Sequence, residues 1–494
     1  MNLNVSPTGT IHVRQGNSTI ELYDHQTAAC TKLVNWNNTA TGNPAGLLVL
    51  PTGGGKTLTA TYWLMQKILS HGKKILWIAH TYSLLEQAYH SFEMVCYKNI
   101  AIGGKNSYSY RIVSGMHCSA YSINPDDDIV IASKASLSVE KPAFRAWLEK
   151  NRDNFYFIID EAHHAPARGY RNLIDDMRKY GGKFFMLGLT ATPFRTDEEE
   201  TGGWMKKVFP DDILYRISIS DLISREILSK PNFERKNTDV DMKKLFEDNN
   251  ATDVYNRIIH NKDFDIGGNG KAAKRAAALI AKNHERNAFI VGTYKNNAAK
   301  YGKTLVFALN QAMAKVLYEY FQAAGVRVGC VISSYGSYAN EQTITQFKND
   351  EIDVLVNVNI VTEGVDVPNV QTVFLTRPTK SKILMTQMIG RGLRGKKVGG
   401  TETTYIVDFL DNWRDDLVAW VIPEKLYAEE AKEILDDEMI LEYDFKKLSN
   451  LEILRAISEG QLSEFIRLAN SKFDLSLFKD FSLIERIPLG YYLF

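Results

Sequence analysis

The stretch Leu50-Pro51-Thr52-Gly53-Gly54-Gly55-Lys56-Thr57 decides the fold of this chain. It follows the apolar run Gly46–Val49, which is typical of a short buried strand, and a helical pattern begins directly after it. A strand, a glycine-rich turn, a Lys-Thr pair and a helix in this order form the layout that cradles nucleotide phosphates. Glycines let backbone N–H groups close around phosphates, and the helix N-terminus adds a partial positive charge. The usual pattern has glycine where this chain has Leu50, so a glycine-rich surface turn remains the alternative.

The composition is that of an ordinary globular protein. The 494 residues are 45% hydrophobic and 24% charged, a length that suggests two to four domains. Because the net charge is +1, any nucleic-acid site must be a local patch or groove. The four cysteines (Cys30, Cys96, Cys118 and Cys330) are scattered, which argues against zinc and disulfides and favours a reducing, cytoplasmic location. We find no signal peptide and no apolar run as long as a membrane span.

Short apolar runs alternate with helical patterns in two series, which predicts right-handed βαβ crossovers and two parallel-sheet α/β domains. The expected strands of the first series are Gly46–Leu50, Lys74–Ala79, Asp128–Ala132, Phe155–Asp160 and Phe184–Leu189. Those of the second are Thr304–Ala308, Val326–Ile332, Asp353–Asn357, Gln371–Leu375 and Thr404–Asp408. Between the series the pattern turns polar and helical. We therefore expect an ATP-binding domain over 1–212, a helical connector over 213–300, a second α/β domain over 301–412 and a helical extension over 413–494.

Two adjacent carboxylates end one of the expected strands. In Phe157-Ile158-Ile159-Asp160-Glu161-Ala162-His163-His164 the apolar run stops at Asp160. Ligands bind at the carboxyl ends of strands in open α/β sheets, so Asp160 is placed to hold Mg²⁺ together with the Thr57 hydroxyl. Glu161 is placed to orient and deprotonate an attacking water. The paired histidines do not predict a metal site, because adjacent residues rarely point at one ion and no third ligand is in sight.

Two further motifs complete the constellation. The segment Gly188-Leu189-Thr190-Ala191-Thr192-Pro193 places two hydroxyls at another strand end, either as ordinary caps or as a relay between two ligand sites. In Gln387-Met388-Ile389-Gly390-Arg391-Gly392-Leu393-Arg394, the two arginines are spaced i, i+3 and share a helix face. A solvated basic face is the alternative. An arginine delivered from a second domain to a γ-phosphate is worth about 10³–10⁵ in rate.

Together these blocks resemble motifs I, II, III and VI of the superfamily 2 helicases, and Asp160–His163 spells the DEAH form. Further blocks resemble motifs Ia (Ala79–Gln87), IV (Leu305–Ala308) and V (Val361–Pro368), and Leu22–Gln26 resembles the upstream adenine-reading block. The amino-acid sequences of motifs V and VI are similar to those of type I and type III restriction subunits, RadD and the XPB-like group. The resemblance implies two tandem RecA-like domains with a helical connector and a small C-terminal helical extension.

The resemblance also implies roles for individual residues. ATP and Mg²⁺ would be bound by Gln26, Thr52, Gly53, Gly54, Gly55, Lys56, Thr57, Asp160, Gly364 and Asp366. The catalytic groups would be Glu161, Arg391 and Arg394. The nucleotide and nucleic-acid sites would be coupled by His163, Thr190, Thr192 and Gln387. The strand backbone would be contacted by His80 and Thr362.

The departures from the family pattern concern nucleic-acid and adenine contacts. Tyr23 stands where the upstream block has arginine, Thr81 replaces an arginine of motif Ia, and an arginine near Gln342 is absent. The expected activity is an ATP-dependent helicase or translocase, on DNA rather than RNA, in phage defence or repair. Three alternatives stay open: a motor subunit that docks a nuclease or effector through the C-terminal extension, an ATPase that binds duplex without unwinding it, and an RNA helicase.

The segment between the two series holds one further candidate contact. Lys271–Arg286 is expected to be an alanine-rich helix packed on the second domain. The following stretch, Asn287–Tyr301, carries Tyr294, Lys295 and Lys300, which we interpret as nucleic-acid contacts.

Overall fold

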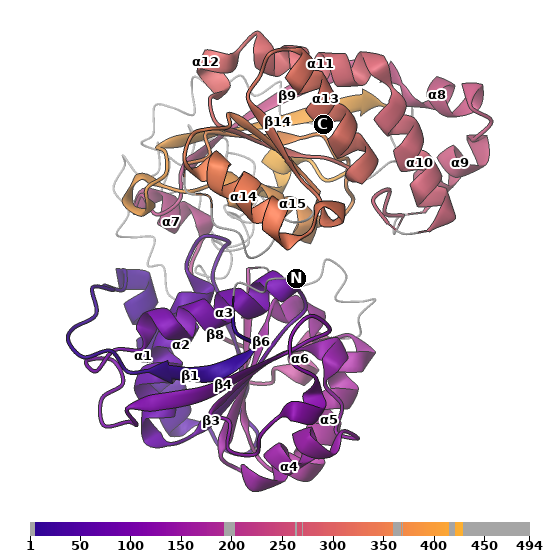
Figure 1. Ribbon diagram of the computed structural model, residues 1–494. Helices are drawn as coiled ribbons and strands as arrows, with labels where there is room; N and C mark the ends of the chain where they lie inside the picture. Colours follow the sequence, from indigo (N-terminus) through magenta and orange to yellow (C-terminus); the bar gives the residue numbers. More distant parts are fainter. Residues whose placement is uncertain are drawn as a thin grey trace, which may run out of the picture. The chain divides into compact units, whose positions relative to one another are not determined.

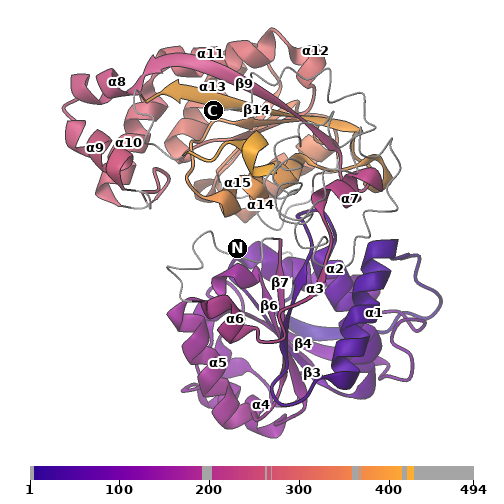
Figure 2. The same cartoon turned by 180° about the vertical axis from the view of Figure 1, so that it is seen from behind.

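A computed structural model of the chain describes residues 5–191, 203–261, 264–268, 270–358, 367, 369–413 and 420–427. These residues contain two β-sheets, each covered by helices on both faces (Figures 1 and 2). Every strand expected from the two series is present, within two residues of its expected ends except that β14 continues to Asn412, four residues beyond the expected Asp408. The prediction of two parallel α/β domains is therefore confirmed.

The first sheet has the strand order β1-β4-β5-β3-β6-β7-β2-β8 and is parallel except for β1, which runs antiparallel to β4. Its strands are β1 (Thr8–His12), β2 (Ala45–Val49), β3 (Lys74–Ala79), β4 (Ser107–Val113), β5 (Ile129–Ser133), β6 (Phe155–Asp160), β7 (Phe185–Thr190) and β8 (Ile213–Arg216). Its helices are α1 (Asp24–Thr39), α2 (Lys56–Lys67), α3 (Tyr82–Val95), α4 (Pro142–Lys150), α5 (Arg168–Gly181) and α6 (Trp204–Val208). We call this part the first sheet domain.

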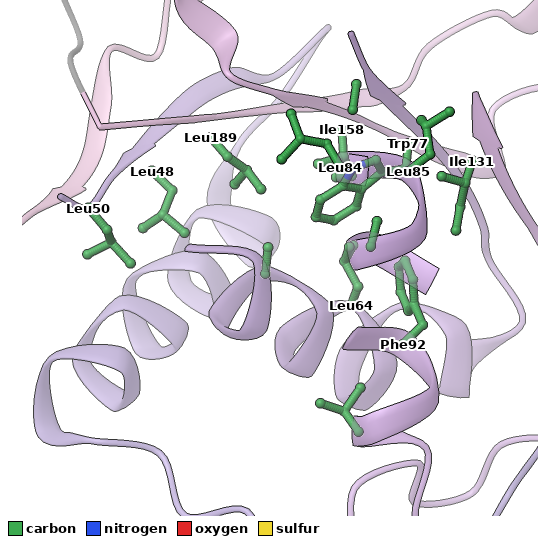
Figure 3. Close-up of a cluster of buried hydrophobic side chains, with 14 of the residues drawn as sticks. Leu48, Leu50, Leu64, Trp77, Leu84, Leu85, Phe92, Ile131, Ile158 and Leu189 are labelled. Carbon is green, nitrogen blue, oxygen red and sulfur yellow. The ribbon is translucent and has the colours of Figure 1, made fainter. Parts of the chain in front are cut away.

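The central strands of this domain are apolar except at their ends, because both faces of the sheet are covered. Successive side chains of a strand point to opposite faces, so Leu48 packs with α2 and α3 while Leu47 packs in the core on the α4 and α5 side. Figure 3 shows the first of these layers, where Leu64 and Phe92 meet the strand residue Trp77. Each such buried side chain stabilises the fold by about 1.5–3 kcal/mol.

The second sheet has the order β11-β12-β10-β13-β14-β9 and is parallel throughout. Its strands are β9 (Lys230–Asp241), β10 (Thr304–Phe307), β11 (Val328–Val331), β12 (Val354–Asn357), β13 (Thr372–Leu375) and β14 (Thr403–Asn412). The helices from α7 onward are α7 (Ile219–Ser224), α8 (Met242–Asp248), α9 (Thr252–His260), α10 (Lys271–Lys282), α11 (His284–Lys295), α12 (Ala298–Tyr301), α13 (Gln311–Ala323), α14 (Ser337–Lys348) and α15 (Lys382–Gly392). We call the part from β9 onward the second sheet domain.

The expectation of a purely helical connector over 213–300 is wrong at two places. β8 pairs with β2 in the first sheet, and β9 pairs with β14 along the edge of the second. β9 escaped detection because an edge strand is only half covered, so its sequence Lys-Pro-Asn-Phe-Glu-Arg-Lys-Asn is polar and lacks an apolar run. The rest of the connector is helical as expected, from α8 to α12.

The connector helices join the core of the second sheet domain instead of standing apart from it. Ala276 and Ile280 of α10 pack in one cluster with Leu317 of α13 and Val306 of β10. This packing confirms the expected role of the alanine-rich helix. Two of the three neighbouring contact candidates are engaged internally, since the Tyr294 ring is buried and Lys300 pairs with Glu234 at 2.6 Å, whereas Lys295 is exposed. The structure therefore gives no support to Tyr294 as a nucleic-acid contact.

Among the helices that the structure describes, none combines the length and the apolar character that crossing a membrane requires. The expected helical extension over 413–494 lies almost entirely outside the described residues.

Candidate nucleotide-binding site

The glycine-rich turn after β2 forms a tight loop that only glycine permits. Gly53 and Gly55 have φ values of 91° and 82°, in the left-handed region that L side chains rarely adopt. The Gly54 N–H donates to the Pro51 carbonyl at 2.8 Å, and Gly55 caps the N-terminus of α2. Lys56 and the remaining first turn of α2 follow at once. The loop, which we call the phosphate loop (Pro51–Thr57), thus presents a helix N-terminus, a favourable place for an anion.

The upstream block lies directly against this loop. A side chain at Gly55 would place its Cβ only 2.3 Å from Nε2 of Gln26, so Gln26 reaches the loop backbone. His25 places Nε2 2.9 Å from the Gly54 carbonyl oxygen. Tyr23, which stands where arginine was expected, bonds through its hydroxyl to the Lys397 carbonyl at 3.1 Å. The departure at Tyr23 thus replaces a charged residue with a hydroxyl that contacts the second sheet domain.

Three of the sequence motifs end neighbouring strands. The sheet order β6-β7-β2 puts Asp160, Thr190 and the phosphate loop side by side at the carboxyl edge of the sheet. Neighbouring strands lie about 4.8 Å apart, so Asp160 is within about 10 Å of the loop. The Leu50 N–H donates to the Thr190 carbonyl at 3.1 Å, which ties the start of the loop to β7. The fold therefore brings motifs together that are far apart in the sequence.

The two carboxylates differ in geometry and charge. Asp160 accepts a 3.0 Å bond from the Glu161 N–H through Oδ1, while its buried Oδ2 has no hydrogen-bond partner among the described residues. Burial and the neighbouring Glu161 charge raise the pKa of Asp160 to about 7. Burial opposes ionisation of Glu161 too, but Lys56 and His163 outweigh it and hold the pKa of Glu161 at about 2. Burial also lowers the pKa of Lys56, against the attraction of both carboxylates.

Glu161 adopts a backbone conformation that is unusual for its residue type. Its φ of 50° lies in the left-handed region, although it is not glycine. Such strain is found where the surrounding structure holds a residue in place, often at functional sites. Here the left-handed conformation of Glu161 turns the chain sharply from β6 into the short 3₁₀ helix Ala162–His164.

A row of three histidines leads away from the carboxylates. Nδ1 of His163 lies 3.4 Å from Oε2 of Glu161. The His163 and His164 rings have centroids 4.2 Å apart, and the His164 and His80 rings are 4.6 Å apart. His80 follows β3, so the row joins the motif Ia block to Glu161. His164 was not singled out from the sequence, since nothing in the pattern shows that its ring would bridge two candidate residues.

The arginine motif lies on and after α15. Gln387 and Arg391 belong to the helix, and Arg394 follows its end. A side chain at Gly390 would place its Cβ 2.6 Å from Cβ of Thr52, and one at Gly53 would lie 2.1 Å from Nη1 of Arg394. The positive charge of Arg391 is among the influences that lower the pKa values of Lys56 and Glu161. The motif therefore contacts the phosphate loop.

Four sequence candidates fall outside the described residues: Thr192, Thr362, Gly364 and Asp366. Two contacting residues that were not expected are Leu222 and Leu228. Leu228 lies near Gly53, and Leu222 lies near Gly54. The sequence does not reveal either contact, because a leucine that touches a glycine-rich loop has the same pattern as any other core leucine.

Comparisons with known proteins agree with this geometry. Residues 19–195 match the family described as "Type III restriction enzyme, res subunit", and residues 285–396 match "Helicase conserved C-terminal domain". The chain is 29% identical over 289 residues to IRC3 of Saccharomyces cerevisiae, whose name assigns it to ATP-dependent helicases. This match covers 58% of the chain and 37% of the yeast protein, so the chain spans well under half of that relative.

Two further likenesses extend over more of the chain. It is 26% identical over 405 residues to the DNA 3'-5' translocase XPB2 of Sulfurisphaera tokodaii, which covers 76% of the chain and 79% of that protein. A fragment of an HsdR subunit of a type I restriction enzyme from Vibrio vulnificus has a similar fold, with a TM-score of 0.50 and 20% identity, over 78% of the chain and 63% of that structure. The chain belongs to the superfamily 2 helicases, with a restriction-enzyme-type first domain and a helicase C-terminal domain.

Proposed function

We propose that the chain is an ATP-driven motor on nucleic acid, whose ATP site is shared by the two sheet domains. The observation that carries this proposal is the meeting of three groups: the phosphate loop, the Asp160–Glu161 pair at the neighbouring strand ends, and Arg394 beside Gly53. Phosphoryl transfer depends on positioning and on electrostatic stabilisation of charge, and these are the groups it requires.

In this proposal each residue has one task. The phosphate loop and Lys56 bind and orient the phosphates. Glu161, held ionised beside Lys56, orients the attacking water and accepts its proton. Arg391 and Arg394 place positive charge where the leaving oxygen becomes more negative, and two-pronged guanidinium contacts suit that task better than lysine. His163, Thr190, Thr192 and Gln387 relay the state of this site to the nucleic acid.

The residues present also fit a magnesium ion. Oδ2 of Asp160 is a buried acceptor without a hydrogen-bond partner in the described part of the chain, and the acidic pair carries more negative charge than Lys56 alone balances. Asp160 and the Thr57 hydroxyl would hold the ion, which prefers one or two carboxylates together with substrate phosphates. When bound, Mg²⁺ supplies charge neutralisation on the phosphate oxygens.

DNA is the proposed nucleic acid. The first domain matches a restriction-enzyme family, and XPB2 is named as a DNA translocase. Contacts to phosphates would make binding independent of sequence and sensitive to salt. His80 and, in the undescribed part of the chain, Thr362, Gly364 and Asp366 keep their expected roles. We propose a role in phage defence, which the restriction-enzyme match supports, with repair as the alternative, and a nuclease or effector subunit is a candidate partner.

The test is ATP hydrolysis measured without nucleic acid and with single-stranded DNA, duplex DNA and RNA. Lys56→Ala and Glu161→Gln are expected to lower turnover on the order of 100-fold or more. Matched controls are Lys67→Ala, at the exposed end of the same helix, and Glu149→Gln, an exposed glutamate. Full turnover in Lys56→Ala or Glu161→Gln would overturn the site. Stimulation by RNA but not DNA would overturn the choice of nucleic acid.

A further inference from the structure

The segment Ser218–Ser229, which joins β8 to β9, contacts both halves of the candidate ATP site. We propose that this linker segment is a positioning element: it fixes Arg394 against the phosphate loop and so sets the rate of hydrolysis. The inference rests on the proposed ATPase function. It adds the part of the chain that sets the position of Arg394 relative to the phosphate loop. No residue of the linker segment touches the reacting atoms in this proposal.

One side of the linker segment packs on the glycines of the phosphate loop. Cδ1 of Leu222 lies 3.1 Å from the place of a Cβ at Gly54, and Cδ2 of Leu228 lies 2.9 Å from the place of a Cβ at Gly53. Both leucines are fully buried, with 0% and 2% exposure. Their side chains therefore fill the space beside the phosphate loop.

The other side holds the backbone around Arg394. The Gly395 N–H donates to the Ile227 carbonyl at 2.9 Å, and the Lys397 N–H donates to the Glu226 carbonyl at 3.1 Å. The contact is so close that a Cβ at Gly395 would lie 2.1 Å from the Glu226 carbonyl oxygen. The segment after α15 is closed by a further hydrogen bond, in which the Thr401 N–H donates to the Arg394 carbonyl at 2.8 Å. The position of Arg394 thus depends directly on the linker segment.

The linker segment is itself internally bonded. Ser218 caps α7 by accepting the Asp221 N–H at 2.8 Å. At the other end of the helix, the N–H groups of Ile227 and Leu228 both donate to the Leu222 carbonyl, at 2.9 and 3.1 Å. These bonds connect the residue that packs on Gly54 with the residues that hold Gly395. A displacement at one contact is therefore passed to the other within a few residues.

The consequence is kinetic. A guanidinium that stabilises a transition state must be held close to its productive position, and a misplacement of about 1 Å can cost on the order of 100-fold in rate. The linker segment defines that position for Arg394, whereas binding of the nucleotide depends mainly on the phosphate loop. Loosening the linker contact should lower kcat and leave nucleotide affinity almost unchanged.

Gly395→Ala tests this inference. Gly395 has a φ of −79°, which alanine adopts without strain, so the substitution acts only through the collision with Glu226. We expect kcat for ATP to fall on the order of 10- to 100-fold, with nucleotide affinity within about twofold of the native protein. The matched control is Gly292→Ala on α11, where a Cβ meets no atom within 4 Å.

A double-mutant cycle separates positioning from a general structural effect. Arg394→Ala is expected to cost much less in the Gly395→Ala background than in the native chain, because both changes remove the same contribution. Equal losses in both backgrounds, or native kcat in folded Gly395→Ala, overturn the inference while leaving the proposed function intact. Native turnover in Arg394→Ala alone overturns both. If Gly395→Ala does not fold, Leu228→Ala is measured by the same two criteria, and Leu228→Met should recover most of the rate.

Discussion

The guanidinium of Arg394 occupies the space that a side chain at Gly53 would need. A Cβ at Gly53 would lie 2.1 Å from Nη1 of Arg394, closer than any non-bonded contact allows. Position 53 therefore requires glycine for two reasons: the φ of 91° that forms the loop, and the close approach of the Arg394 and Leu228 side chains to the place of a Cβ.

Gly53→Ala should separate these two reasons. We expect ATP turnover to fall on the order of 100-fold, since the methyl group displaces Arg394. Gly42→Ala is the matched control, because Gly42 has a similar φ of 81° but nothing within 4 Å of its Cβ position. Steady-state ATPase rates and melting temperatures of the two variants are the measurements. Equal loss of activity in both would show that backbone strain alone explains the effect.

His164 should couple nucleic-acid contact to hydrolysis. Its ring lies between those of His80 and His163, and His163 faces Glu161. We expect His164→Ala to reduce the stimulation of ATPase by DNA severalfold while basal turnover changes less. His164→Phe should retain part of the stimulation, because an aromatic ring keeps the edge-to-face and tilted contacts with His80 and His163. An equal fall in basal and stimulated rates would contradict coupling and indicate a structural role.

The buried ion pair Arg286–Asp411 should stabilise the second sheet domain. Nε of Arg286 lies 2.8 Å from Oδ1 of Asp411, with side-chain exposures of 0% and 1%, and Nη2 donates to the Thr376 carbonyl. Arg286→Ala leaves a buried carboxylate unpaired, which should cost about 3–5 kcal/mol in the free energy of unfolding. Denaturant unfolding measures this change. The exposed pair of Lys396 and Glu402 is the control, and Lys396→Ala should leave unfolding unchanged.

Asp408 should make stability depend on pH. Burial raises its pKa to about 7, with Asp411 adding to the shift and Arg235 and Arg286 opposing it. Between its ordinary value of 3.8 and about 7, the folded state keeps a proton that the unfolded state releases. This contribution is therefore favourable at low pH and is lost as the pH rises through about 7.

Asp408→Asn is the test of that pH dependence. Because Asp408 is partly exposed, solvent screening limits the expected gain to on the order of 1–2 kcal/mol at pH 8, with no gain near pH 4. Urea unfolding of both proteins at the two pH values gives the difference. A difference that does not change with pH would show that Asp408 is ionised normally in the folded protein.

The sequence predicted the central strands of both sheets, whereas β1, β4, β8 and β9 were not predicted. Runs such as Phe155–Ile159 are apolar because both faces are buried, and parallel strands place their chemistry at one edge. The positions of Asp160, Thr190 and the phosphate loop follow from that rule. That these three groups lie side by side could not be predicted, because it depends on the order of the strands in the sheet, and the sequence of one strand does not determine that order.

What escaped prediction depends on contacts between distant segments. β9 is a half-covered edge strand, so its polar sequence resembles a loop or a helix. The left-handed conformation of Glu161 is imposed by its surroundings, since glutamate has no preference for it. Leu222 and Leu228 owe their importance to the glycines that they touch, and no local pattern reveals such a partner.

The most direct test of the shared site is the ATPase rate of Arg394→Ala measured beside nucleotide affinity, with Arg394→Lys as the comparison. The account predicts a fall in kcat on the order of 1,000-fold, incomplete recovery by lysine, and nucleotide affinity within a few-fold of the native protein. Native kcat in Arg394→Ala would contradict it, because the arginine that the second sheet domain places beside Gly53 would then contribute nothing to hydrolysis.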